Sequence, residues 1–209
     1  MQPNWAEENL QVIRTLMERA GLYRRALAPV MLSVGLIGLT AGAYGTSLSG
    51  KTFMGFITYW SCACLLSLVA SIGISRRQAI KSDEQFWSPA TRRVVLAFLP
   101  GLASGAGVTV VLSGLGAGRG GSAQDGVLFV PIWLIFYGCG LHAAGWFVSQ
   151  GMRRLAWGFI LCGILVLSGA FAFDGERMPA HWLMGATFGG LHLIAAAYLY
   201  FTEKREPTP

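Results

Sequence analysis

Six long apolar segments that lack Asp, Glu, Lys and Arg constrain the fold of this chain more than any other feature. A bilayer core of about 30 Å is crossed by about 20 helical residues, because each residue advances the helix by about 1.5 Å. Each segment has roughly this length and is bounded by charged, Gly or Pro residues. The sequence therefore predicts six membrane-spanning helices, at 27–47, 53–74, 94–115, 127–150, 155–173 and 182–202.

The composition agrees with a membrane protein. Hydrophobic residues make up 54% of the chain and charged residues 12%, about half of the roughly 25% charged residues of a soluble domain. The mean hydropathy is +0.52. Four cysteines, Cys62, Cys64, Cys139 and Cys162, all fall inside apolar segments, where we expect small packing side chains and no disulfides. We therefore expect an all-α polytopic bundle of six transmembrane helices, and we exclude a soluble enzyme and a disulfide-stapled secreted module.

Basic residues are distributed unequally between the two ends of the predicted helices. With a cytoplasmic N-terminus, 13 of the 16 Lys and Arg residues fall on the cytoplasmic side, and only Lys51, Arg119 and Arg177 fall outside. Basic residues that flank membrane helices are retained in the cytoplasm. We therefore expect both termini to be cytoplasmic, and this bias explains the net charge of +6 without a nucleic-acid partner.

The segment before the first span is predicted to be an amphipathic helix. Within residues 1–25, apolar residues recur at three- and four-residue steps, at Leu10, Ile13, Leu16, Met17 and Ala20. We expect this helix to lie on the inner membrane surface; the alternative is that residues 1–20 dock a membrane or cytoplasmic protein. The predicted organisation is a cytoplasmic helix at 1–25, a transmembrane domain at 26–203 and a cytoplasmic tail at 204–209.

The longest predicted cytoplasmic connection, residues 75–93, combines basic and aromatic side chains. Aromatic rings favour the headgroup depth of a bilayer, and arginines there meet anionic lipid. The residues expected to contact lipid or a protein partner are Arg76, Arg77, Phe86, Trp87, Arg92 and Arg93.

Three predicted helices carry glycines four residues apart. Small residues at this spacing let helix backbones approach closely, so that packing replaces the hydrophobic drive that lipid removes. We expect packing within the bundle, with a homo-oligomer face as the alternative use of one pair. The glycines are Gly38 and Gly42, Gly101 and Gly105, and Gly185 and Gly189.

Two histidines, His142 and His192, lie well inside predicted spans, and each ends a Gly-Leu-His triplet. An ionisable residue within a membrane is costly and calls for a functional hypothesis. The imidazoles either form hydrogen bonds between helices or ligate a b-type haem from two sides. A divalent metal site has less support, because no carboxylate or third histidine accompanies them at that depth. We interpret His181, beside Trp182, as an anchor at the outer interface.

Several segments together resemble a group of bacterial six-helix integral membrane proteins that have no assigned activity. The resemblance covers most of the chain and implies a protein of the bacterial cytoplasmic membrane, with no catalytic residue to transfer. The segments that carry it are residues 8–20 (ENLQVIRTLMERA), 98–100 (FLP), 133–134 (WL), 137–138 (YG) and 188–192 (FGGLH).

The sequence favours a non-enzymatic function. It has no H-E-x-x-H motif, no membrane aspartate pair and no Walker lysine. We expect a bacterial inner-membrane protein that acts as a partner-binding, sensory or accessory subunit. One alternative is a haem-binding electron-transfer subunit that uses His142 and His192. Another is a channel or carrier for a small neutral solute.

Overall fold

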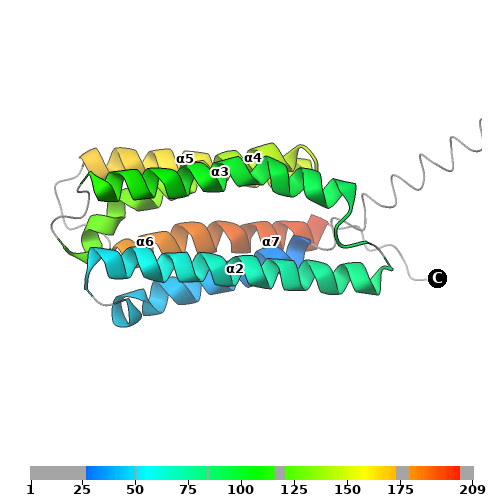
Figure 1. The fold of residues 1–209 in the computed structure, drawn as a ribbon, viewed down its shortest axis with the longest axis horizontal. Helices are drawn as coiled ribbons and strands as arrows, with labels where there is room; N and C mark the ends of the chain where they lie inside the picture. Colours follow the sequence, from blue (N-terminus) through cyan, green and yellow to red (C-terminus); the bar gives the residue numbers. More distant parts are fainter. Residues whose placement is uncertain (1–26, 50, 84, 116–120, 173–178, 203–209) are drawn as a thin grey trace, which may run out of the picture.

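A computed structural model of the chain describes residues 27–49, 51–83, 85–115, 121–172 and 179–202 (Figure 1). The predicted amphipathic helix at 1–25 and the tail at 204–209 lie outside these residues. The described residues form helices and turns and no strand.

Six helices in the described part of the chain are long and apolar enough to cross a membrane, which confirms the predicted all-α architecture. The fourth begins with a 3₁₀ segment, η1 (Ala123–Leu128), before α4, and the sixth consists of α6, a π-helical segment η2, and α7 in one continuous run. The helices are Leu27–Leu48, α2 (Phe53–Lys81), α3 (Pro89–Gly114), α4 (Phe129–Gly145), α5 (Gln150–Ala172), and α6 (Ala180–Met184) with η2 (Gly185–Gly189) and α7 (Gly190–Thr202).

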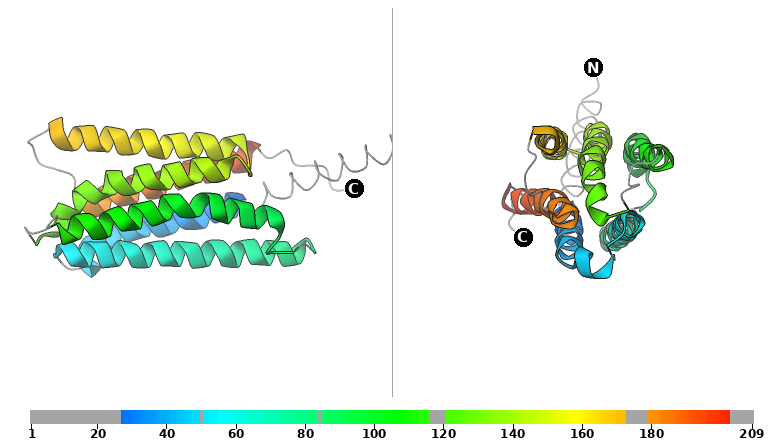
Figure 2. Two further views of the ribbon diagram at one scale, coloured as in Figure 1. Left: turned by 45° about the horizontal axis from the view of Figure 1, so that its top comes forward. Right: turned by 90° about the vertical axis from the view of Figure 1, so that its left-hand side faces the viewer.

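The helices lie side by side in two rows of alternating direction. Viewed end on, α3, α4 and α5 form one row, and α2, the Leu27–Leu48 helix and α7 form the other (Figure 2). Helix α4 occupies the middle of its row and packs against both α3 and α5. Side chains between the rows, including Phe56, Leu134 and Phe159, are fully buried.

The structure corrects three predicted helix ends: the end of α2, the start of α3 and the end of α4. Helix α2 continues to Lys81 and α3 begins at Pro89, so the predicted 75–93 connection is mostly helical. Ser88 caps α3 by accepting a hydrogen bond from the Thr91 amide, and Pro89 suits a first helical turn. Charged residues end the membrane-compatible part of a helix without ending its backbone hydrogen bonds. Helix α4 ends at Gly145 and not at residue 150, because the chain turns there before α5.

Helices α2 and α3 are the least buried members of the bundle. In the most apolar stretch of each, 11% of the residues are buried, against 50% in the span Asp125–Gly145. Three of the four buried residues of α2, Phe53, Phe56 and Trp60, belong to its first turns, and Ser67 is the fourth. Most of the buried side chains of α2 therefore gather at its beginning, while Ala63 and Ile74 further along are partly buried against the core.

Candidate functional site

Two of the predicted glycine pairs face each other across one helix interface. A Cβ added to Gly38 would come within 2.9 Å of Gly189 Cα, and one added to Gly42 within 2.7 Å of Gly185 Cα. No side chain fits between these backbones. The Leu27–Leu48 helix and the antiparallel α6–η2 segment are therefore in direct backbone contact at two successive turns.

The contact between these two helices includes one further pair of residues at each end. Gly35 lies against Leu193, and Gly45 lies against the imidazole ring of His181. The contacting positions are spaced by three and four residues on the Leu27–Leu48 helix and by four throughout on the other. A π-helix takes more residues per turn than an α-helix, because its hydrogen bonds run from i to i+5. The η2 segment thus keeps positions four apart on one face and aligns His181 with the glycines.

His181 joins three elements through hydrogen bonds. Trp60 Nε1 of α2 lies 3.1 Å from His181 Nδ1, and Ser49 Oγ, after the Leu27–Leu48 helix, lies 2.8 Å from Nε2. An indole N–H only donates, so Nδ1 accepts and the proton of the neutral ring lies on Nε2. His181 therefore donates to Ser49 and accepts from Trp60.

Aromatic rings enclose this histidine. The ring centroid of Phe56 lies 4.9 Å from that of His181, the centroid of Tyr59 lies 5.6 Å away, and Trp60 is stacked at 24°. His181 is only 2% exposed, so the predicted interfacial anchor is wrong. Trp182 beside it is 50% exposed and is the residue that meets the surroundings. Gly45 is the reason that the ring fits, because a side chain there would occupy its place.

His192 has the opposite tautomer. Its Nδ1 lies 2.8 Å from the Phe188 carbonyl oxygen, which only accepts, so Nδ1 carries the proton. Nε2 then accepts from the Tyr137 hydroxyl of α4, also at 2.8 Å. The ring is fully buried beside Phe159 and Phe188. Both nitrogens of His192 are therefore used to hold α7 to α4 and to its own preceding turn.

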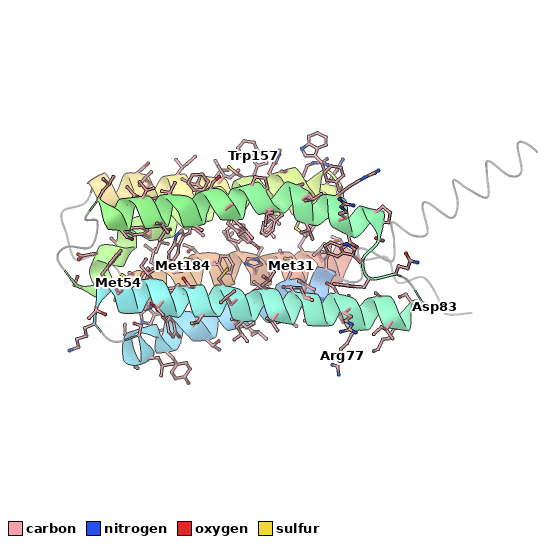
Figure 3. All side chains as sticks on the ribbon, viewed as in Figure 1. Met31, Met54, Arg77, Asp83, Trp157 and Met184 are labelled. Carbon is pink, nitrogen blue, oxygen red and sulfur yellow. The ribbon has the colours of Figure 1, made fainter. Side chains whose placement is uncertain are left out.

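The structure does not bring His142 and His192 together. His142 lies in the last turn of α4, where its ring contacts Trp146 and Trp157. Trp157 is 52% exposed and lies on the outer side of α5 (Figure 3). The two histidines have no aromatic neighbour in common, and the Nε2 lone pair of His192 is occupied. This arrangement does not fit a haem held between the two imidazoles.

Other chemistry has little support among the described residues. No group of three or more His, Cys, Asp or Glu residues there could hold a metal ion. The four cysteines are free, and three of them, Cys62, Cys64 and Cys139, are exposed and not packed as predicted. Ser49 and His181 resemble a nucleophile and base, but the tautomer is the wrong one, because the nitrogen facing the hydroxyl carries the proton.

The third glycine pair packs on α4. A Cβ at Gly101 would come within 2.6 Å of Gly140 Cα, whereas one at Gly105 would meet Phe136 Cβ at 3.4 Å. Trp133 of α4 donates from Nε1 to Thr109 Oγ1 of α3 at 2.7 Å. Close backbone approach and one polar contact thus join α3 to α4.

Seven of the eight basic residues in the described part of the chain lie at one end of the bundle, and we call them the basic collar. Figure 3 shows Arg77 near the end of α2 and Asp83 just beyond that end, opposite the end with Met54. The eighth residue, Lys51, precedes α2 at that opposite end. The collar consists of Arg76, Arg77 and Lys81 of α2, Arg92 and Arg93 of α3, and Arg153 and Arg154 of α5.

Aromatic rings accompany the collar. Trp87 is 60% exposed next to Phe86 between α2 and α3. The guanidinium carbon of Arg153 lies 4.4 Å from the centre of the Trp146 ring, and Arg154 Nη1 donates to the Tyr198 hydroxyl at 3.1 Å. Cationic and aromatic side chains therefore meet at one level, as at the headgroup depth of a bilayer.

Comparison with family models, with curated proteins and with solved structures finds no match.

Sequence reasoning missed the partners of the histidines. Trp60, Tyr137 and Ser49 are ordinary residues of apolar helices or their ends, and nothing in their spacing links them to His181 or His192. One available signal was the full glycine series Gly35, Gly38, Gly42 and Gly45 on one helix face, which indicates a partner with small or flat side chains.

Proposed function

We propose that this chain is a multi-pass protein of the bacterial inner membrane, with its basic collar in the cytoplasm. Six apolar helices support the insertion, and the concentration of basic residues at one end supports the orientation. The exposed surface of the helices is apolar along its length, with Val69 of α2 and Leu165 of α5 as examples. Such a surface is stable in lipid and not in water.

Within that membrane we propose a non-enzymatic role as a partner-binding, sensory or accessory subunit. The basic collar carries this proposal. Arg76, Arg77, Arg92 and Arg93 are all exposed, and Trp87 adds an exposed aromatic side chain beside them. Arg and Trp are typical of binding surfaces. The buried histidines, in contrast, already use both of their ring nitrogens in holding helices together.

Site-specific photo-crosslinking in growing bacteria tests the proposed partner. A photoreactive amino acid replaces Trp87 in the collar or, as the matched control, Val110, an exposed residue in the apolar part of α3. We expect one discrete protein adduct from position 87 and only lipid adducts from position 110. Changing Arg76, Arg77, Arg92 and Arg93 to Gln should weaken the adduct. Lipid adducts alone at both positions would contradict partner binding.

Deletion of residues 1–20 tests the second predicted contact. We expect the deleted chain to insert and fold, and to lose its partner. The amount of protein in the membrane fraction and the crosslink from position 87 report these two properties separately. Loss of insertion would show that the segment serves folding, and that it is not a docking helix.

A further inference from the structure

We propose that His181 is an acid-sensitive clasp, whose protonation releases the beginning of α2 from the rest of the bundle. The proposal deepens the proposed sensory role, and it rests on that proposal for the side from which acid arrives. His181 lies at the end of the bundle opposite the basic collar, which is the outer side in the proposed orientation.

The hydrogen bonds of His181 permit only the neutral ring. Protonation places a second N–H on Nδ1, and this N–H points at the indole N–H of Trp60, which is 3.1 Å away and only donates. Two donors then face each other without an acceptor. The bond from Nε2 to Ser49 survives, because a hydroxyl accepts as well as donates. Protonation therefore breaks the contact with α2 and keeps the contact with the Leu27–Leu48 helix.

Among the described residues around His181, no carboxylate supplies a counter-charge to a protonated ring. Tyr59 of α2 is the titratable residue whose ring contacts His181, and its hydroxyl donates to the Ala41 carbonyl at 3.0 Å. On η1, which packs against α6, the Asp125 carboxylate accepts from the Ser122 amide and hydroxyl. Tyr44 on the Leu27–Leu48 helix is 61% exposed. No described carboxylate bonds to the imidazole, and the helix N-terminus at Ala180 also disfavours a cation there.

Protonation of His192 has a different consequence. Its Nδ1 already donates to Phe188, and protonation adds a donor at Nε2, where the Tyr137 oxygen accepts once its hydroxyl hydrogen rotates away. The Tyr137 contact is thus compatible with either charge state. Of the two fully enclosed histidines, only His181 loses a partner when it is protonated.

Release at Trp60 matters because most of the buried residues of α2 lie at this end. Phe53, Phe56 and Trp60 are buried here, and beyond them only Ser67 of α2 is buried. The far end of α2 carries Arg76, Arg77 and Lys81 of the basic collar. A movement at the outer end of this one rigid helix therefore reaches the collar on the other side.

Distance measurement between two spin labels tests the clasp in the purified full chain, reconstituted in liposomes. The four native cysteines are replaced by Ala, and labels are placed at Ile80 of α2 and Phe201 of α7, which are 70% and 81% exposed. We expect the interspin distance to shift reversibly between about pH 8 and about pH 4.5, which bracket the usual histidine titration. The partner is absent, so a failure of partner binding does not affect this result.

Substitutions distinguish the contributions of the two histidines to the acid-induced shift. His181→Gln keeps an acceptor for Trp60 and a donor for Ser49 but does not titrate, and it should abolish the acid-induced shift. His192→Gln should retain it. If His181→Gln does not fold, Trp60→Phe serves instead, since it removes the opposing donor. Trp157→Phe, at a 52% exposed side chain of α5, is its control and should respond like the wild type. An unchanged distance in the wild type, or a shift that persists in His181→Gln or Trp60→Phe, would overturn the proposal.

Discussion

Gly42 and Gly185 are in direct backbone contact, because a Cβ built on either glycine would lie 2.6–2.7 Å from the Cα of the other. Gly42 belongs to the Leu27–Leu48 helix, and Gly185 is the first residue of the π-helical segment η2. These two segments are far apart in the sequence. The contact sets how closely these two helices approach, and it places His181 against Gly45 one turn further along.

Enlarging Gly42 is expected to destabilise the bundle. Gly42→Val forces the two backbones apart, and overpacking of this kind costs about 1–3 kcal/mol. Thermal unfolding in detergent, followed by circular dichroism, should show a lower midpoint.

Gly73→Ala is the matched control for Gly42→Val. No atom lies within 4 Å of a Cβ at Gly73, so this change should be neutral or should stabilise the helix by about 0.5–1 kcal/mol. Equal effects of the two substitutions would contradict the backbone contact.

Removal of the Tyr137 hydroxyl should also destabilise the protein. Tyr137→Phe leaves His192 Nε2 buried without a hydrogen-bond donor, at a cost of about 1–3 kcal/mol. Tyr44→Phe, at a 61% exposed side chain, should have no measurable effect. In a His192→Leu background the same change should cost much less, because the lone pair is gone. Additive losses in this double-mutant cycle, measured by unfolding, would show that the two side chains do not interact.

The visible absorption spectrum tests the haem alternative. Protein purified in mild detergent from cells supplied with haem precursor and iron should show no Soret band before or after dithionite, because His142 and His192 do not face one haem. A Soret band that sharpens on reduction, and that disappears in both His142→Ala and His192→Ala, would instead establish the electron-transfer function.

The six-helix architecture could be predicted because the length and composition of each apolar segment are enough to identify it as a membrane-compatible helix. Helix ends were less accessible, since α2 runs past its last apolar residue to Lys81 and α4 stops at Gly145, where the chain turns into α5. Charge marks the edge of the bilayer, but backbone hydrogen bonds decide where a helix ends.

The histidine sites could not be predicted, because they depend on which helices become neighbours. The contacts of His181 with Trp60 and of His192 with Tyr137 join residues far apart in the sequence. The π-helical segment η2 also changes the direction in which later side chains point, compared with a regular helix of 3.6 residues per turn. It turns His192 away from the glycine face that holds His181.

In the proposed topology the bundle spans the membrane with its basic collar inside. Single cysteines at Lys51, Val69 and Ser82, in a chain without native cysteines, test it directly with a membrane-impermeant maleimide. All three positions are exposed on the protein, and they lie before, within and after α2. We expect labelling of position 51 in intact spheroplasts, of position 82 only after the membrane is opened, and of position 69 only after denaturation. Labelling of position 69 in intact membranes, or of position 82 before position 51, would contradict it.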